Sequence, residues 1–201
     1  MKIKPSILEG TVVRLEPLSM SHVDGLSAAG IDEELWRYTM TVIWNRGDME
    51  RYVEAAIELQ KEGKALPFAI IEKTSGRAIG STRYGNIDGT NKSVEIGWTW
   101  VARDWQRTPV NTECKYLLLK HAFEALGCIR VEFKTDSTNM QSRNALARIG
   151  SREEGILRNH MITPSGRIRH SVYFSIVDSE WVAVKKGLEE KLARLPGNQR
   201  A

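Results

Sequence analysis

The stretch that decides the fold runs from residue 94 to residue 126 and reads VEIGWTWVARDWQRTPVNTECKYLLLKHAFEAL. In its first eight residues Val94, Ile96, Trp98 and Trp100 alternate with Glu95 and with small or polar residues. This period of two is typical of a half-buried strand, in which successive side chains point to opposite faces. The pattern therefore predicts a strand over 94–101 with the four apolar side chains on one face.

A helix is expected to follow the strand, after a loop over 102–107. Thr108 suits the N-cap position, and Pro109 suits the first helical position, where its missing N–H costs no hydrogen bond. Apolar residues then recur at spacings of three and four until Gly127 ends the helix. They are Cys114, Leu117, Leu118, Ala122, Ala125 and Leu126. The free N–H groups and positive dipole end of such a helix form a potential anion site.

Together with IRVEFKTDSTNMQSRNALARIGSREEG over 129–155, this stretch resembles the cofactor-binding core of the GNAT acyltransferases. The positions of Glu95, Asn139, Ser142 and Gly150 around the loop carry the resemblance. It is closest to the branch that contains the ribosomal-protein N-terminal acetyltransferases. It covers 9–181 as one GNAT-like domain and leaves 182–201 as a C-terminal helix and a frayed tail. It implies acetyl-CoA as cofactor and direct acyl transfer to an amine in a ternary complex.

In this family a Gln/Arg-x-x-Gly-x-Gly/Ala loop cradles the coenzyme A pyrophosphate, and 106–111 occupies that place. Pro109 and Asn111 stand where glycines would be, so one N–H donor is lost and the backbone's approach to phosphate narrows. The backbone of 99–101 is implied to bind the pantetheine amides like an added strand. The implied cofactor-binding residues are Thr99, Trp100, Val101, Gln106, Arg107, Thr108, Val110, Asn111, Thr112 and Asn139.

Two side chains are candidates for the proton transfers. The resemblance implies that Glu95 is the general base for the acceptor amine, whereas position alone favours a salt bridge, for instance with Arg83. Many GNAT enzymes protonate the departing thiolate with a tyrosine on the helix that begins at Asn139, but Leu146 holds that place here. Ser142, one turn after Asn139, is then the candidate donor, and its alternative is a solvent-facing hydroxyl.

The acceptor side is less clearly marked in the sequence. Trp36, Tyr38 and Trp44 form an aromatic-rich connection that either packs between helices or lines an acceptor pocket together with Arg83. The acceptor stays open between a protein N-terminus, a polyamine, an antibiotic and another small amine. A coenzyme A-binding module that has lost catalysis is the alternative function.

Composition restricts the remaining classes. The 201 residues are 41% hydrophobic and 27% charged, with a net charge of +4, which is typical of one ordinary globular domain. Basic residues do not cluster with aromatic ones, histidines lack metal-ligand spacing, and Cys114 and Cys128 lie in apolar surroundings, so buried thiols are expected. We expect a cytoplasmic protein without nucleic-acid, membrane or metal partners, and a homodimer stays open.

The other elements complete an α+β domain. A helix capped by Asp48 precedes strands expected over 66–72 and 77–86, and later strands are expected over 129–135, 156–162 and 168–177. Asn139 begins a helix that ends at Gly150, and Asp178 caps the last helix. The resemblance implies a mixed, mostly antiparallel central sheet, flanked by helices and splayed at the cofactor site. The tail over 195–201 is expected to fray.

Overall fold

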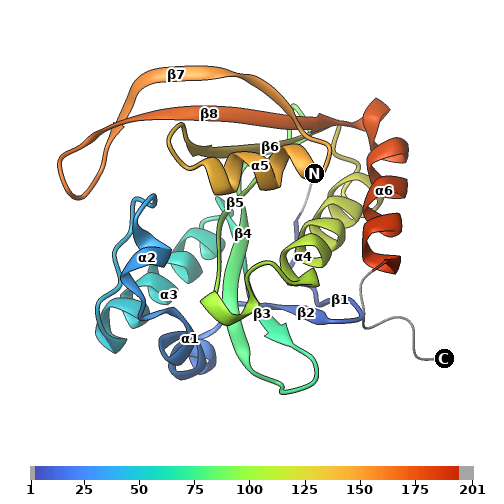
Figure 1. Cartoon of the computed structure of the whole chain (residues 1–201). Helices are drawn as coiled ribbons and strands as arrows, with labels where there is room; N and C mark the ends of the chain where they lie inside the picture. The colour runs from blue at the N-terminus through green and yellow to red at the C-terminus, as the bar shows by residue number, and fades with distance from the viewer. Residues whose placement is uncertain (1–2, 195–201) are drawn as a thin grey trace.

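One sheet runs through the whole molecule, of which the computed structural model describes residues 3–194. Within those residues eight strands follow one another in the order β1-β2-β3-β4-β5-β6-β8-β7 (Figure 1). Every neighbouring pair is antiparallel except β5 (Ser93–Val101) and β6 (Arg130–Asp136), which run parallel. The predicted α+β class with a mixed, mostly antiparallel sheet is confirmed. The tail over 195–201 lies outside the described residues.

The remaining bounds are as follows. The other strands are β1 (Leu8–Glu9), β2 (Val13–Pro17), β3 (Leu66–Glu72), β4 (Ala78–Asp88), β7 (Arg152–Ile162) and β8 (Ile168–Val177). The helices are α1 (Val23–Gly30), α2 (Glu33–Trp36), α3 (Arg46–Lys61), α4 (Pro109–Lys120), α5 (Met140–Arg148) and α6 (Asp178–Ala193). Short 3-10 turns, η1 and η2, lie at Met20–His22 and Arg103–Trp105, and the π-helical turn η3 continues α4 over His121–Ala125.

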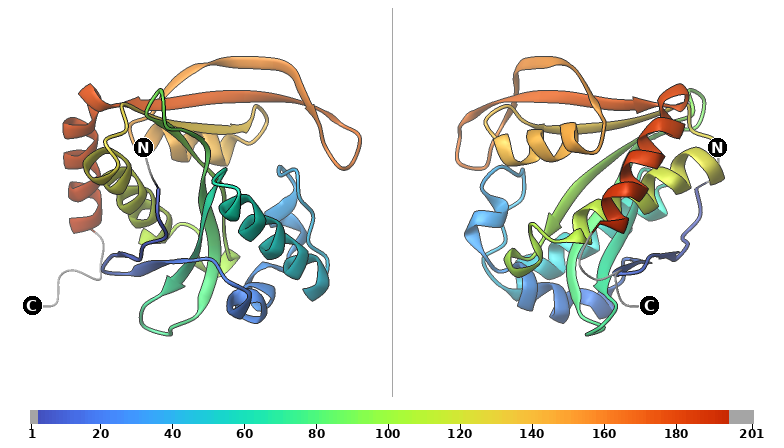
Figure 2. Two further views of the ribbon diagram at one scale, coloured as in Figure 1. Left: turned by 180° about the vertical axis from the view of Figure 1, so that it is seen from behind. Right: turned by 45° about the vertical axis from the view of Figure 1, so that its right-hand side comes forward.

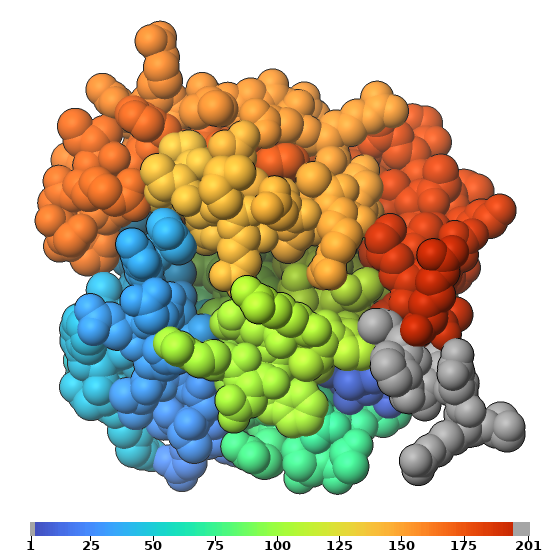
Figure 3. Space-filling model, viewed as in Figure 1, coloured from blue at the N-terminus to red at the C-terminus, as the bar shows by residue number. Residues whose placement is uncertain are grey.

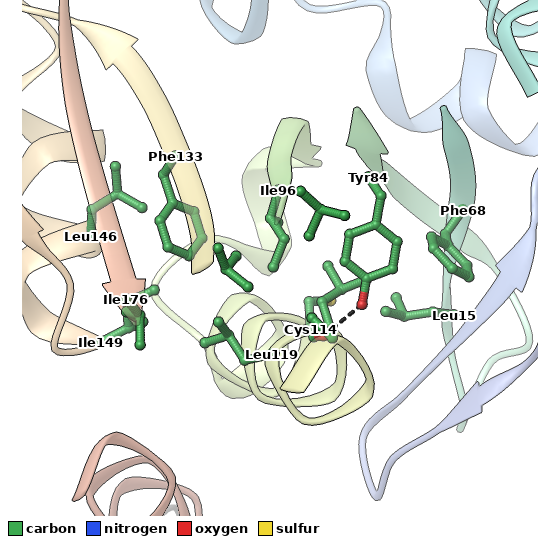
Figure 4. Packing of buried hydrophobic residues seen from close by; sticks show 14 of the residues in the cluster. Leu15, Phe68, Tyr84, Ile96, Cys114, Leu119, Phe133, Leu146, Ile149 and Ile176 are labelled. Atoms are coloured by element: carbon green, nitrogen blue, oxygen red, sulfur yellow. Dashed lines mark hydrogen bonds between the residues drawn. The ribbon is translucent and has the colours of Figure 1, made fainter. Parts of the chain in front are cut away.

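Helices cover both faces of the sheet (Figures 1 and 2). One buried cluster lies under α4 and α6 and includes Phe68, Tyr84 and Phe133 (Figure 4). The other lies under α1 and α3 and includes Trp36 and Trp100. Full burial of each such side chain contributes about 1.5–3 kcal/mol relative to leaving it in water. The strands between the two clusters are therefore fixed from both sides.

The start of α4 agrees with the sequence prediction, and the start of α3 does not. Thr108 is the N-cap of α4, its hydroxyl accepts from the N–H of Val110, and Pro109 takes the first helical position. Asp48 was expected to cap the helix after residue 44, but the N-cap is Asn45, and Asp48 is the third helical residue. Its carboxylate accepts from the Asn45 N–H, which makes Asp48 the second half of a capping box.

A buried carboxylate fixes α4 to the edge of the sheet. Glu113 on α4 accepts hydrogen bonds from the N–H groups of Thr11, Val12 and Val13 at 2.7–2.8 Å. A side chain at Gly10 would meet this carboxylate, since an added Cβ would lie 2.6 Å from its oxygen. Hydrogen bonds to a charged group are stronger than neutral ones. The hydrogen bonds of Glu113 to the backbone of 11–13 thus fix the position of the first turns of α4.

Strand β5 contains a bulge that the sequence pattern concealed. Ser81 is opposite Trp100 and Arg83 is opposite Gly97, so β5 has one extra residue between these two pairs. Trp98 has φ of 49° and its side chain is 42% exposed, whereas Trp100 is buried in the cluster under α1 and α3. The prediction of four apolar side chains on one face is therefore wrong, because a bulge moves every later residue to the opposite face.

Helix α6 belongs to the body of the domain. Trp181 and Leu188 of this helix are buried in the cluster under α4. The Trp181 indole N–H also donates to Glu124 at 3.0 Å. Because α6 begins at Asp178, the expected division at 181/182 falls inside this helix. Cys114 and Cys128 are both buried thiols, as predicted, and burial raises the pKa of Cys114 to about 12 and of Cys128 to about 11.

Candidate active site

The centre of the candidate site is a split in the sheet. The parallel pairing of β5 and β6 covers Ser93 to Glu95 on β5 and ends at the pair of Glu95 with Glu132. Beyond it β5 continues to Val101, paired among the described strands only with β4. The backbone of 97–101 therefore presents one edge that no described strand covers. We call the space between this edge and β6 the split, and it is the splayed sheet that was predicted.

A loop and a helix face each other at one mouth of the split (Figure 3). Gln106, on the loop before α4, donates from its amide to the Val101 carbonyl at 3.1 Å. Gln141, on α5, donates to the Gln106 amide oxygen at 3.2 Å. Arg107 is exposed and has φ of 60°, a left-handed conformation next to the helix N-cap. The side chain of Gln106 thus ties the loop to the end of β5 and to α5.

The first turn of α4 provides donors for an anion. Because Thr108 is the N-cap, helix geometry leaves the N–H groups of Thr108, Val110 and Asn111 without partners in the helix. The Thr108 hydroxyl holds the Val110 N–H only loosely, at 3.4 Å. Thr112 is buried, and its hydroxyl accepts from Arg148 of α5 at 3.5 Å. Arg148, which the sequence interpretation did not select, brings a guanidinium to this turn.

Helix α5 lies on the β6 side of the split. Its N-cap is Asn139, whose side-chain oxygen accepts from the Ser142 N–H at 3.0 Å, so the predicted cap is confirmed. The Ser142 side chain is half-buried in the first turn. Leu146, at the place of the family's tyrosine, is buried in the main cluster. Within the described residues, Ser142 therefore remains the candidate donor that this helix offers.

Glu95 lies where β5 and β6 begin to diverge, and its side chain is 3% exposed. One carboxylate oxygen accepts from the Asn86 amide at 2.7 Å and lies 3.4 Å from the Lys134 ammonium. The alternative interpretation of Glu95, a salt bridge, is present, but its partner is Lys134 of β6 and not Arg83.

A buried lysine lies on the opposite face of β5. Lys115 of α4 donates to the Thr99 hydroxyl at 2.8 Å, and this hydroxyl also bonds that of Thr82 at 2.8 Å. The ammonium lies 5.8 Å from the centre of the Phe133 ring on β6. Burial lowers the pKa of Lys115 to about 8. A basic group is thereby placed next to the uncovered part of β5.

A cavity of about 380 Å³ adjoins the split on the face covered by α3. We call it the α3 cavity; it is lined by Thr41, Val42, Ile43, Asp48, Arg51, Tyr52, Ala55, Arg83 and Trp98. Of the four residues predicted to bind the acceptor, only Arg83 is in the lining of this cavity. Tyr38 offers its carbonyl to Arg169 at 3.3 Å, and Trp44 is 58% exposed. Trp36 packs in the core, 5.3 Å from the Trp100 ring, and its indole N–H donates to Gly30.

Three charged or polar residues around Glu95 and Thr99 were not selected from the sequence, namely Asn86, Lys115 and Lys134. Lys134 follows from alternation, since Val131 and Phe133 face the core and Glu132 and Lys134 face the other side. Lys115 precedes the buried Leu118 and Leu119 by three and four residues, which places it on the buried face of α4. The contact of Asn86 with Glu95 depends on the register between β4 and β5, and local sequence patterns do not reveal that register.

In residues 3–194 no helix combines the length and the apolar character needed to cross a membrane. The same residues contain no group of three or more His, Cys, Asp or Glu that could hold a metal ion.

Known proteins share this architecture. The acetyltransferase (GNAT) domain model matches residues 13–152, which is more than half of the chain. The crystal structure of a GCN5-related N-acetyltransferase from Brucella melitensis superimposes with a TM-score of 0.90 at 35% identity, covering 96% of this chain and 88% of that one. The chain therefore belongs to the GNAT acetyltransferase family, and it is an acyltransferase.

Two further similar proteins are a curated relative and a solved structure. A candidate ribosomal N-acetyltransferase of Bacillus subtilis, YdaF, is 32% identical over 110 residues, which are 55% of this chain and 59% of that protein. The structure of Mycobacterium smegmatis RimJ in complex with CoA-disulfide has the same fold, with a TM-score of 0.77 at 24% identity over 93% of this chain and 92% of that one. These similarities fit the predicted branch.

Proposed function

We propose that the protein transfers an acetyl group from acetyl-CoA to an amine, with Glu95 as the general base. The observation that carries this proposal is the buried Glu95 carboxylate at the apex of the split, diagonal in the sheet to Arg83, which lines the α3 cavity. A base there can take a proton from an amine that enters through the cavity, directly or through one water. Direct transfer in a ternary complex is the mechanism that we propose, because the cofactor at the β5 edge and the acceptor in the α3 cavity would be bound at the same time.

The residues around the split fit a coenzyme A thioester. The uncovered N–H and C=O groups of 99–101 suit the pantetheine amides, and the α4 N-terminus with Arg107 suits the pyrophosphate. Gln106 and Asn139 would contribute through the loop and α5, together with Val110, Asn111 and Thr112 of the first α4 turn. Arg148 adds positive charge to that turn. When bound, the thioester supplies the activated acyl group.

The chain's own groups then manage charge and protons. An N–H of the uncovered β5 edge would donate to the thioester carbonyl, where negative charge develops. Asn86 and Lys134 hold the Glu95 carboxylate in place. The Ser142 hydroxyl would donate to the departing sulfur, since Leu146 cannot. A protein N-terminus and a small-molecule amine are the acceptor classes, and the ribosomal relative supports the first.

The test measures free thiol released from acetyl-CoA with a panel of peptides and small amines. Acyl transfer predicts release that depends on an acceptor and an acetylated product of the correct mass. A coenzyme A-binding module would instead bind acetyl-CoA in calorimetric titration and release thiol only at the background rate. That result would contradict the proposal.

A further inference from the structure

We infer that the acceptor carries a carboxylate near its amine and that Arg83 binds this carboxylate in the α3 cavity. This inference rests on the proposed function, since it defines the acceptor class of the same site. Its basis is a guanidinium that lines the cavity and that the protein itself leaves without an anion.

Arg83 is 4% exposed, yet within the described residues its side chain has no hydrogen bond and no ion pair. The guanidinium carbon lies over two aromatic rings, those of Tyr52 and Trp98, 5.2 Å from the centre of each. A buried charge without a counter-charge is costly, and proteins normally pair it or hydrogen-bond it. The missing partner is therefore expected to come from a ligand.

The guanidinium itself offers a fixed hydrogen-bonding geometry to a ligand. Its carbon lies over the two rings, and its five N–H groups lie in the guanidinium plane and point outward from its edges. A planar carboxylate matches such an edge with two parallel hydrogen bonds. The Trp98 ring takes this position because of the bulge and because Gly85 leaves room for it: an added Cβ at Gly85 would lie 2.4 Å from the ring.

The register of β4 and β5 places Arg83 near Glu95, the proposed general base. Arg83 is opposite Gly97, and Gly85 is opposite Glu95, so Arg83 and Glu95 are diagonal neighbours on one face of the sheet. Diagonal neighbours in an antiparallel pair are about 7–8 Å apart, within the length of a small amino acid held between two side chains. An acceptor with its amine at Glu95 and its carboxylate at Arg83 fits this spacing.

The charges of the cavity lining favour an anionic group over a second cation. Asp48 is the acidic residue in that lining, and its oxygens already accept from Arg51 and from the N–H groups of Trp44 and Asn45. A second buried guanidinium, Arg169 on β8, lies against the loop that leads into the cavity and donates to Tyr38. A polyamine would bring more positive charge to Arg83, so it is disfavoured.

Binding is tested with product pairs that differ only in the carboxylate. N-acetyl-leucine and N-acetyl-leucinamide are titrated into the full-length protein by calorimetry, with intrinsic tryptophan fluorescence as a second readout. The carboxylate form should bind at least tenfold more tightly, and Arg83→Met should reduce this preference to less than twofold. Arg83→Met keeps the stem between the two rings and removes a buried charge, so its thermal stability should not fall. Arg77→Met, an exposed arginine at the turn before β4, is the matched control.

Equal affinity for the two products, or a preference that survives Arg83→Met, would overturn the inference. Turnover is then compared for leucine, leucinamide and spermidine. It is also compared for a short peptide whose second residue is acidic and for the same peptide with the corresponding amide residue at that position. Thiol release that requires the carboxylate supports the inference, and the two arms separate a free amino acid from a peptide. Release with every amine regardless of carboxylate refutes it and leaves acyl transfer intact. Carboxylate-selective binding without any release contradicts acyl transfer and supports the anion site.

Discussion

The two halves of β5 differ in what they present to the split. Before the bulge, 93–97 lies beside both β4 and, at its start, β6, and its functional group is the Glu95 side chain. After the bulge, 98–101 is paired on one edge only, and its functional groups are those of the backbone. Under the proposed function, one strand would place a carboxylate on the acceptor side and bare amides on the cofactor side. The single inserted residue lies between these two halves of the strand.

The largest expected effect comes from the first half. Glu95→Gln keeps the shape of the side chain and removes the proton acceptor, so turnover should fall by roughly 10²-fold or more. Acetyl-CoA affinity should stay within twofold, because the cofactor side is untouched. The loss should shrink at high pH, where the amine is already deprotonated. Steady-state kinetics from pH 7 to 10 measure it, and an unchanged rate at neutral pH would reduce Glu95 to a structural carboxylate.

These two halves also differ in how far the sequence predicts them. The strand, the loop and the capped α4 follow from local rules, because an N-cap threonine, a proline and a period of 3.6 act within a few residues. The bulge does not, since Trp98 and Trp100 continue the period of two begun by Val94 and Ile96, although they lie on the opposite face of the sheet. The partner of Glu95 was missed for a related reason: Lys134 reaches it through β5–β6 pairing between segments distant in the chain.

The second expected effect concerns Lys115 of α4, which contacts Thr99 in the later half of β5. Burial lowers the pKa of Lys115 to about 8, against an ordinary value of 10.5. Between these pH values the unfolded chain holds a proton that the folded protein has released, so folding stability from this group rises with pH. The gain is up to about 3 kcal/mol across that window.

Lys115→Met provides the comparison, because it fills similar space without a titrating group. Chemical unfolding at pH 7.5 and pH 10 should show the wild type gaining stability relative to the variant. The difference between the two proteins is the relevant quantity, since the Cys114 thiol, whose pKa burial raises from 9.0 to about 12, adds its own pH dependence to the stability of both. Parallel stability curves would mean that Lys115 has an ordinary pKa.

A smaller effect is expected at the mouth of the split. Arg107→Glu replaces a favourable charge beside the α4 N-terminus with a repulsive one, so acyl-CoA affinity should weaken by about tenfold, equivalent to about 1.4 kcal/mol. Turnover at saturating cofactor should change little, since Glu95 is unaffected. Arg77→Glu carries the same charge change at a distant exposed turn and serves as control. Calorimetric titration showing equal affinity for both variants would place the pyrophosphate elsewhere.

The smallest effect is expected from the two residues that replace the family's glycines. Pro109 takes the first helical position, where its fixed φ suits the helix and its missing N–H had no helical partner. Pro109→Gly restores a donor but adds about 1 kcal/mol of chain entropy to the unfolded state, so thermal stability should fall while affinity changes by less than about fivefold. Asn111→Gly removes a half-buried side chain from the proposed approach to phosphate.

The double variant decides whether this loop is a working cofactor site. Thr108, Val110 and Asn111 offer the same N–H groups in the parent and, apart from side chains, in the variant, so both should bind coenzyme A with similar affinity. If the loop were a relic, restoring both glycines would create binding that the parent lacks. Parallel titrations of parent and Pro109→Gly/Asn111→Gly distinguish the two cases. Binding by the double variant alone would remove the cofactor from the parent's split, and the division of β5 into an acceptor half and a cofactor half would then fail.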